Sequence, residues 1–271
     1  MGRCVGSAYS AGSLLALLLH VQILGLLHPQ GARVWTNLAD QPVEARPGES
    51  YGKQGFAIEV RCPAQSRCPP DSAAGRRAYR GRLRVEDGGS ELRLINDVEL
   101  EDYVASVVGA EIDAAPAAAR EALAIVARTF AVRAEKSGHL CDTAHCQWYR
   151  GVERADIASA RKTSGVVLLL NDGRPAPAFH SQDCGGTTRE GWAPPGPGAA
   201  GRRRNGGLSP AGQASVRTPD THLPGLPRGS GHGVGLCQRG AAFLATKGAS
   251  AHQILARYFP RLHIGRLTLD F

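Results

Sequence analysis

The sequence predicts an α+β fold, in which short strands and hairpins surround a central pair of helices. Two helical patterns follow each other between residues 100 and 135, and alternating strand patterns lie before and after them. Strands and helices do not alternate regularly, as they do in a doubly wound sheet. The 34 Gly and 17 Pro among 271 residues argue against a purely helical bundle. With 42% hydrophobic residues, the chain can bury a core and is not expected to be disordered.

The first 30 residues have the composition of a secretory leader and are expected to lie outside the fold. Arg3 precedes an apolar run from Ala11 to Leu27, and no acidic residue occurs before Asp40. His20 and Gln22 interrupt this run, which is shorter than the ~20 apolar residues of a spanning helix. We therefore expect a cleaved signal peptide or, as the alternative, an uncleaved anchor. The protein is then extracytoplasmic and bacterial, and only this segment contacts the membrane.

Residues 31–78 form the second region. Their Pro-rich and Gly-rich composition predicts an irregular segment with one short strand at 56–60. The main domain is expected from residue 79 to residue 271. It begins with a hairpin, because residues 79–85 and 91–95 alternate apolar and polar side chains on either side of a glycine turn.

The central helices are predicted at 100–112 and 116–135. In the first helix, Val104, Val107 and Val108 recur at helical spacing and mark the face toward the core. The second begins at Pro116, a residue that suits the first helical position. The later elements are expected as follows: strands at 166–170, 176–180 and 262–269, helices at 239–246 and 251–258, and an irregular stretch at 191–230.

The positive net charge favours an anionic wall or membrane surface as a partner. Lys and Arg number 32 against 24 Asp and Glu, a net charge of +8, which draws an extracytoplasmic protein to an anionic wall or membrane surface. Aromatic residues make up only 6%, which is low for a protein that binds nucleic acid by stacking. The densest basic run, at 202–204, lies in a Gly-rich and Pro-rich loop and is expected to be solvated. We therefore expect no nucleic-acid partner.

Seven cysteines occur, and Cys4 lies in the expected leader. The even number that remains, in an extracytoplasmic protein, favours disulfides. The neighbouring candidates are Cys62 with Cys68 and Cys141 with Cys146, which leaves Cys184 and Cys237. The segment from residue 139 to residue 147 also contains two imidazoles and two thiols, which can ligate one tetrahedral zinc. Zinc and a Cys141–Cys146 disulfide are alternatives here.

Glu111 is the first candidate for chemistry. It lies seven residues after Val104 and therefore on the face of the valines. A carboxyl group beside apolar side chains loses solvation, keeps its proton more readily and can donate it as a general acid. The alternative is a glutamate at a frayed helix end, paired with an arginine such as Arg128.

Two glycine-containing segments are candidates for the walls of a site. In the first, His180 and Ser181 lead into a turn with Gly185 and Gly186. Neighbouring side chains on a strand point to opposite faces, so a substrate-lining turn is favoured over a His–Ser catalytic pair. In the second, glycines flank His232 and allow the backbone to approach a ligand closely. The glycine spacing is not that of a phosphate-binding loop.

Taken in order, these segments resemble the stage II sporulation protein D family, whose domain is shared by the amidase-enhancer proteins. The resemblance covers roughly residues 80–262. It rests on these segments: Leu100-Glu101-Asp102-Tyr103-Val104, Ala110-Glu111, Ala127-Arg128-Thr129-Phe130-Ala131, Cys141-Asp142-Thr143, His145-Cys146-Gln147, Tyr149-Arg150-Gly151, Phe179-His180-Ser181, Cys184-Gly185-Gly186, and Gly231-His232-Gly233-Val234-Gly235 with Gln238 and Gly240-Ala241. Each motif is weak alone, whereas their common order is specific.

The resemblance implies a peptidoglycan lytic transglycosylase. Glu111 would cleave the bond between N-acetylmuramic acid and N-acetylglucosamine, first as general acid and then as general base, leaving a 1,6-anhydro end without a second carboxylate. The implied glycan groove is lined by Arg128, His180, Ser181, Gly185, Gly186, His232 and Gln238.

The resemblance also implies a structural zinc, held by His139, Cys141, His145 and Cys146, while the chemistry itself requires no cofactor. The implied partners are peptidoglycan glycan strands and a cell-wall amidase. The alternative function is a non-catalytic wall-binding protein that enhances an N-acetylmuramoyl-L-alanine amidase.

Overall fold

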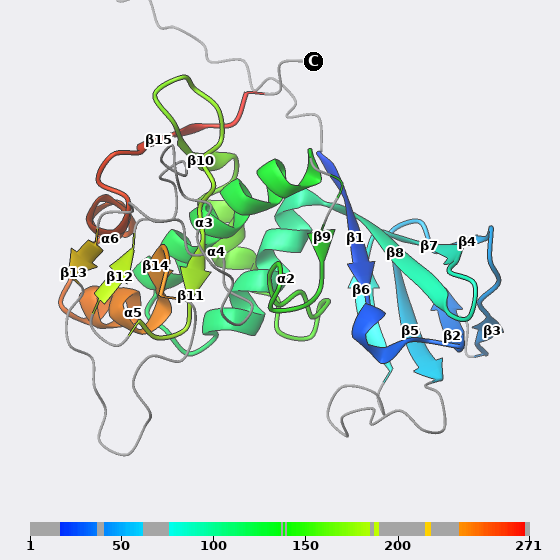
Figure 1. Ribbon diagram of the computed structural model, residues 1–271. Helices are drawn as coiled ribbons and strands as arrows, with labels where there is room; N and C mark the ends of the chain where they lie inside the picture. Colours follow the sequence, from blue (N-terminus) through cyan, green and yellow to red (C-terminus); the bar gives the residue numbers. More distant parts are fainter. Residues whose placement is uncertain are drawn as a thin grey trace, which may run out of the picture.

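The structure is a computed structural model, and it describes residues 17–36, 41–61, 76–136, 138, 140–184, 187–189, 215–217 and 233–268. Figure 1 shows two regions, one built of strands from the first hundred residues and one built mainly of helices. The mixed α+β fold predicted from the sequence is confirmed.

The first sheet has five strands in the order β4-β7-β8-β1-β9. Their bounds are β1 Leu18–Ile23, β4 Ser50–Tyr51, β7 Arg82–Asp87, β8 Leu92–Glu99 and β9 Leu140–Cys141. β7 and β8 form the predicted hairpin. β1 pairs antiparallel with β8 and parallel with β9, so it joins the hairpin to the segment that follows the central helices.

The position of β1 corrects the expectation that residues 1–30 lie outside the fold. Leu19, Val21 and Ile23 are fully buried, and the burial of the strand alternates from residue to residue. His20 and Gln22, which interrupt the apolar run, are the opposite face of this strand. Residues 1–16 lie outside the described residues, and a leader there stays a prediction. Within the described ranges, no helix is both long and apolar enough to cross a membrane.

The second sheet has four strands in the order β3-β2-β5-β6. Their bounds are β2 Gly31–Thr36, β3 Val43–Glu44, β5 Gly55–Arg61 and β6 Arg77–Arg80. The expectation of an irregular region from 31 to 78 is therefore wrong for its described part, although the strand at 56–60 is confirmed within β5. The exposed faces of these strands carry charged residues in cross-strand ion pairs, such as Arg33 with Glu59 at 2.6 Å. Because of these charged residues, the strands are difficult to recognise from the composition of the region.

Gly81 divides the predicted strand at 79–85 between the two sheets. Its φ is +80°, and a Cβ added there would lie 2.0 Å from the carbonyl oxygen of Asp97. Only glycine fits this turn. The chain therefore leaves the four-stranded sheet at Arg80 and enters the five-stranded sheet at Arg82.

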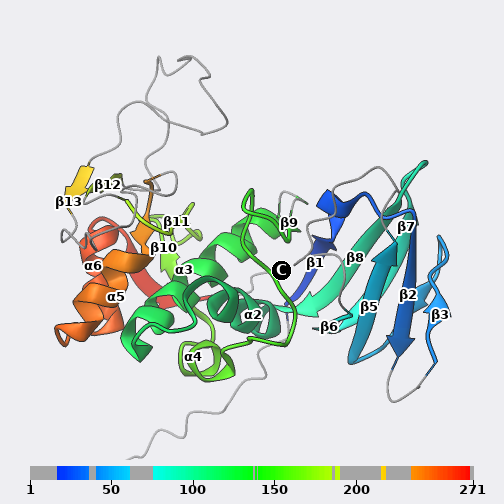
Figure 2. The same ribbon diagram turned by 90° about the horizontal axis from the view of Figure 1, so that it is seen from below.

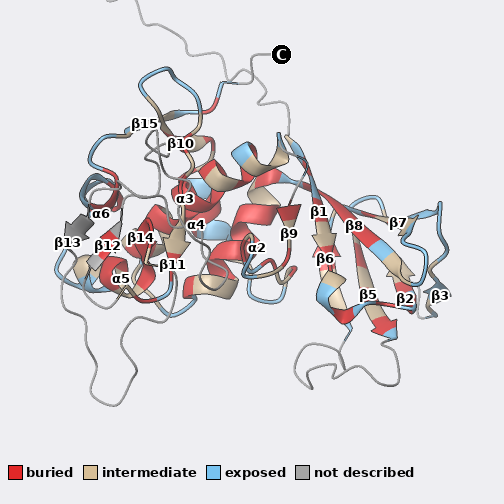
Figure 3. Ribbon diagram, viewed as in Figure 1, coloured by how far each residue is buried: buried red, intermediate tan, exposed pale blue. Residues whose placement is uncertain are grey.

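The central helices are α2, Leu100–Ile112, and α3, Ala117–Glu135, and both predictions are confirmed. α3 contacts α2 and α4, Ile157–Lys162, as well as α5, Gln238–Thr246, and α6, Ala251–Tyr258. Figure 2 shows α3 between these two groups of helices. Figure 3 shows the buried residues concentrated along α2 and α3, so this pair forms the core of the helical region.

The remaining elements are a turn between β1 and β2 and the short strands of the helical region. Their bounds are a 3₁₀ turn at Gly25–Leu27 and the strands β10 Val166–Leu169, β11 His180–Ser181, β12 Thr187–Arg189, β13 Ser215–Arg217, β14 Leu236–Cys237 and β15 His263–Arg266. The predicted helices at 239–246 and 251–258 are confirmed, and Ser250 caps α6. The predicted strand at 176–180 is wrong except for His180. α4 was not predicted.

Candidate functional site

Glu111 lies in the last turn of α2, where it is half-buried. Two donors hold its carboxylate. The backbone N–H of Trp148 donates to Oε1 at 3.1 Å, and the side-chain amide of Gln238 donates to Oε2 at 2.8 Å. One donor follows β9 and the other is the first residue of α5, so three segments that are distant in the sequence meet at this carboxylate.

His180 lies beside the same amide. The Nε2 atom of Gln238 is 3.1 Å from Nδ1 of His180. β11 and β14 pair in parallel with His180 opposite Leu236, and α5 starts directly after β14. An amide nitrogen carries two hydrogens, so Gln238 can donate to both Glu111 and a neutral imidazole. The structure thus brings together three residues that the sequence analysis placed in one site.

The valine stripe of α2 explains where the carboxylate lies. Val104, Val107 and Val108 are fully buried, and Glu111 continues their face one turn later. The helix ends at Ile112, and there the stripe reaches the margin of the core. Glu111 therefore meets polar donors at this margin, whereas the sequence suggested apolar surroundings alone.

Residues 147–156 run along α2 and bring Trp148 to this margin. The N–H of Arg150 donates to Oγ of Ser106 at 3.1 Å, and the N–H of Asp156 donates to the carbonyl of Ala105 at 2.8 Å. A Cβ added at Gly109 would lie 1.4 Å from a carbonyl oxygen of the same segment. Glycine at this position therefore allows the close approach.

A comparison with known families matches the middle of the chain. Residues 88–169 match the family model described as SpoIID, stage II sporulation protein. The chain carries a SpoIID domain. The family has a cell-wall and sporulation-related function and is associated with peptidoglycan-related enzymatic activity. The matched range contains Glu111 and Trp148, whereas His180 and Gln238 lie beyond it. No curated protein matches the chain.

Arg128 lies inside the SpoIID domain but away from the Glu111 carboxylate. Its fully buried guanidinium pairs with Glu101 at 2.9 and 2.6 Å, and donates to the carbonyls of Ala160 and Val166 at 3.1 Å. Because these donors are occupied inside the core, the prediction that Arg128 binds substrate is wrong. The alternative pairing of Arg128 with Glu111 is also wrong. Arg128 joins α2, α3 and α4.

Ser181 is buried in β11, opposite Cys237. Its hydroxyl has no hydrogen-bond partner within the described residues. Ser181 is thus more deeply buried than His180, as expected for neighbours on a strand. Gly185, Gly186 and His232 of the predicted groove lie outside the described residues.

Three of the four predicted zinc ligands of the SpoIID domain lie together. The ligand atoms of Cys141, His145 and Cys146 are all within 4.8 Å of one another, and Nδ1 of His145 is 3.8 and 3.7 Å from the two sulfur atoms. Tetrahedral zinc separates a nitrogen and a sulfur ligand by roughly 3.6 Å, so the donor set and its spacing fit the metal. His139, the fourth predicted ligand, lies outside the described residues.

Hydrogen bonding among these residues favours a thiolate. The pKa of the Cys141 thiol is lowered to about 4, chiefly because Cys146 donates a hydrogen bond to its sulfur, with smaller contributions from Thr143 and His145. The same bond raises the pKa of Cys146, which keeps its proton. A thiolate is the form of cysteine that binds zinc.

Cys184 and Cys237, the pair predicted by elimination, are also close in space. Their sulfur atoms and a carboxylate oxygen of Asp183 lie within 4.8 Å of one another. Asp183 accepts from Arg239 at 2.9 Å, which supplies positive charge at this cluster and disfavours a cation there. Cys62 and Cys68 lie outside the described residues.

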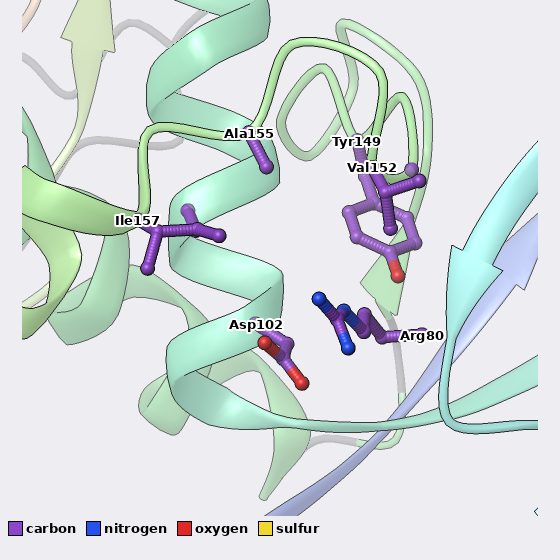
Figure 4. A pocket seen from close by; sticks show the side chains of 8 residues that line it. Arg80, Asp102, Tyr149, Val152, Ala155 and Ile157 are labelled. Carbon is purple, nitrogen blue, oxygen red and sulfur yellow. The ribbon is translucent and has the colours of Figure 1, made fainter. Parts of the chain in front are cut away.

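A separate hollow lies beside the first half of α2 (Figure 4). Asp102, Arg80 and Tyr149 line it, together with Ile157. Its volume of about 60 Å³ is far below the roughly 300–1,000 Å³ of small-molecule pockets. None of the three residues at the Glu111 site lines this hollow, so it is not the candidate site.

Sequence reasoning missed Trp148. Its contact with Glu111 comes from the backbone, and every residue except proline has such an N–H, so no residue type marks it. The one sequence feature that could have drawn attention to residue 148 is that tryptophan is rare, with three in the chain.

Proposed function

We propose that the chain is a lytic transglycosylase that cleaves peptidoglycan glycan strands with Glu111 as the single acid–base catalyst. The observation that carries the proposal is the Glu111 carboxylate, held by donors from Trp148 and Gln238 at the margin of the core. A carboxylate has roughly four lone-pair sites, so two remain for the transferred proton. His180, beside the same amide, contributes to the wall of the site.

The reaction needs one proton, which leaves Glu111 and returns to it. Protonated Glu111 donates to the glycosidic oxygen as the bond from that oxygen to C1 of the N-acetylmuramic acid breaks. Positive charge develops on C1 and its ring oxygen. The 6-hydroxyl oxygen of the same sugar then bonds to C1, and its proton passes to Glu111. The products are a free 4-hydroxyl and a 1,6-anhydro ring, and no water is consumed.

We also propose a structural zinc at Cys141, His145 and Cys146, with His139 as the fourth ligand. When bound, the metal would hold the segment between β9 and Trp148 and would take no part in proton transfer. Protein purified under reducing conditions is expected to contain one zinc per chain by elemental analysis. Cys141→Ser should lose it and Cys184→Ser should keep it. Metal-free wild type with a Cys141–Cys146 disulfide, found by mass spectrometry of alkylated protein, would refute the zinc site.

The substrate implies where the protein acts. Peptidoglycan lies outside the cytoplasmic membrane, so we propose an extracytoplasmic location for the chain. The net charge of +8 supports binding to an anionic wall. A cell-wall amidase that acts on the same strands is the proposed partner.

The test uses the full chain and glycan strands from which the stem peptides have been removed. Mass spectrometry of the products should show 1,6-anhydro ends with wild type. Glu111→Gln should reduce their rate of release by at least about 100-fold, the scale of a lost general acid. Asp113→Asn, an exposed acid two residues away, is the matched control and should retain the rate.

An absence of anhydro ends with wild type would refute the proposal. If wild type then still sediments with intact sacculi and stimulates an N-acetylmuramoyl-L-alanine amidase, the chain is the non-catalytic enhancer instead.

A further inference from the structure

Trp148 and Arg150 lie on the outward edge of an extended segment. Gln147 and Tyr149 are buried, whereas Trp148 is 38% exposed and Arg150 is half-buried. This alternation directs the indole and the guanidinium to the same side of the segment. Arg150 accordingly stacks over the Trp148 ring, with its guanidinium carbon 4.0 Å from the ring centroid.

The inward residues hold this pair in place. The Tyr149 hydroxyl donates to Asn96 at 2.6 Å, and the Arg150 N–H donates to Ser106 at 3.1 Å. The Trp148 N–H donates to the Glu111 carboxylate at 3.1 Å. The indole therefore belongs to the residue whose backbone N–H orients the candidate catalyst, on a segment held by its neighbours.

The Arg150 guanidinium is unpaired within the part of the chain that the structure describes. Within the described residues, no carboxylate lies at ion-pair distance from it, and no hydrogen bond engages its donors. Burial and the nearby charge of Arg77 lower the pKa of Arg150, and the charges of Asp142 and Glu111 offset only part of this lowering, although the group stays protonated. An anion bound here would offset both effects.

Stacking leaves part of the indole available. Arg150 covers one face of the ring, so the exposed area of Trp148 comes from the other face and the edges. A flat aromatic surface with a fixed orientation suits the C–H face of a pyranose ring. The planar guanidinium suits a carboxylate, which it can bind through two parallel hydrogen bonds.

We propose that Trp148 and Arg150 form a glycan-binding subsite next to Glu111. The indole stacks on a pyranose ring, and the guanidinium binds a carboxylate substituent of the same strand. In peptidoglycan without stem peptides, that substituent is the free lactyl carboxylate of N-acetylmuramic acid. The inference rests on the proposed function for its choice of glycan, and it adds the residues that discriminate a carboxylated strand from a neutral one.

The test measures binding rather than turnover, by isothermal titration calorimetry of the full chain carrying Glu111→Gln. Two probes of equal length are compared: a tetrasaccharide of alternating N-acetylglucosamine and N-acetylmuramic acid with free lactyl carboxylates, and neutral chitotetraose. Adding Trp148→Ala should weaken both probes by about tenfold or more, because the indole is lost while the backbone N–H to residue 111 remains. Trp148→Phe should restore part of the affinity.

Arg150→Gln should weaken the carboxylated probe by about tenfold, the scale of a charge-assisted pair, and leave chitotetraose within about twofold. Trp35 is the matched control because Arg76 stacks over its ring at 5.0 Å in the strand region, and Trp35→Ala should change neither affinity.

Unchanged binding of both probes in Trp148→Ala would overturn the subsite, as would equal losses for both probes in Arg150→Gln. The outcome is separable from that of the proposed function. If wild type releases no anhydro ends but these affinities change as stated, the enzyme proposal fails and the subsite stands. If anhydro ends form but the affinities do not change, the reverse holds.

Discussion

At the residue scale, one amide orients two side chains of the candidate site. Gln238 donates to Glu111 at 2.8 Å and lies 3.1 Å from Nδ1 of His180. It is itself buried at the start of α5, so its orientation is held by the packing around it. The direction of the Glu111 carboxylate therefore depends on where α5 lies relative to α2.

Gln238→Leu should slow release of 1,6-anhydro ends by about 10-fold to 100-fold, because the carboxylate loses one of its two donors while the buried volume is retained. The rate should fall with little change in the urea midpoint of unfolding. Gln54→Leu, at an exposed position of the strand region, is the control. A rate equal to that of wild type would show that Gln238 does not position the acid.

Arg128 is a structural residue, and its replacement should act on stability. Arg128→Leu should lower the free energy of unfolding by about 3 kcal/mol or more, since it leaves Glu101 without its charge partner and the carbonyls of Ala160 and Val166 without this donor. Urea unfolding followed by circular dichroism measures the loss. Arg174→Leu, which removes an exposed ion pair, should show no measurable change. Full stability of the Arg128 variant, combined with weaker glycan binding, would restore Arg128 to the groove.

At the element scale, β1 shows how composition misleads. Leader peptides and buried strands are both apolar, and Leu-rich runs do not reveal a period of two unless polar residues occupy alternate positions. His20 and Gln22 do occupy such positions, but six residues are too few to outweigh an apolar run at the N-terminus. The pairing with β8, which is distant in the sequence, settles the assignment.

Leu19→Ala and Leu18→Ala test whether β1 belongs to the folded protein. Leu19 is fully buried and its neighbour is 43% exposed. Leu19→Ala should cost about 2–5 kcal/mol in the free energy of unfolding, whereas Leu18→Ala should cost under about 1 kcal/mol. The measurement is urea denaturation of both variants beside wild type. Equal and small effects would mean that residues 18–23 do not form a strand of this sheet.

Helices and strands differed in how well they could be predicted. The ends of α2 match the prediction, and α3 starts one residue later than predicted, because helical periodicity and capping are local signals. The short strands of 31–78 depend on partners elsewhere in the chain, and β11 is only two residues long. α4 is six residues long, which is too short for a clear amphipathic pattern.

At the scale of the whole molecule, the buried carboxyl group of Asp142 links the strand region to the cysteine segment. Asp142 is 6% exposed and accepts the N–H of Leu24 at 2.9 Å, and Arg77 lies 4.0 Å away. Burial raises the pKa of Asp142 from 3.8 to about 6. Ionisation of Asp142 therefore opposes folding.

Stability should fall as the pH rises from about 4 to about 6. In this window the unfolded chain has lost the Asp142 proton, whereas the folded protein still holds it, so folding binds a proton and weakens with rising pH. The change amounts to about 3 kcal/mol for a pKa difference of roughly two units, and it levels off above the folded pKa. Urea unfolding at a series of pH values should show this slope for wild type.

Asp142→Asn should remove that part of the slope because the amide does not titrate. Asp113→Asn, at an exposed position, should retain it. If the difference in unfolding free energy between wild type and Asp142→Asn is constant from pH 4 to pH 7, the buried carboxyl does not titrate as described.

The sequence by itself determined the α+β class, the helix that carries Glu111, and the face of that helix on which the glutamate lies. These features depend on residues that are close together in the sequence, so the order of apolar and polar residues predicts them. The tertiary structure alone decided that β1 belongs to a sheet, that Arg128 is buried away from the site, and that Trp148 and Gln238 hold the carboxylate. These contacts join residues 27 or more positions apart in the sequence. The packing of distant segments, and not local composition, decides which side chain or backbone group makes each contact.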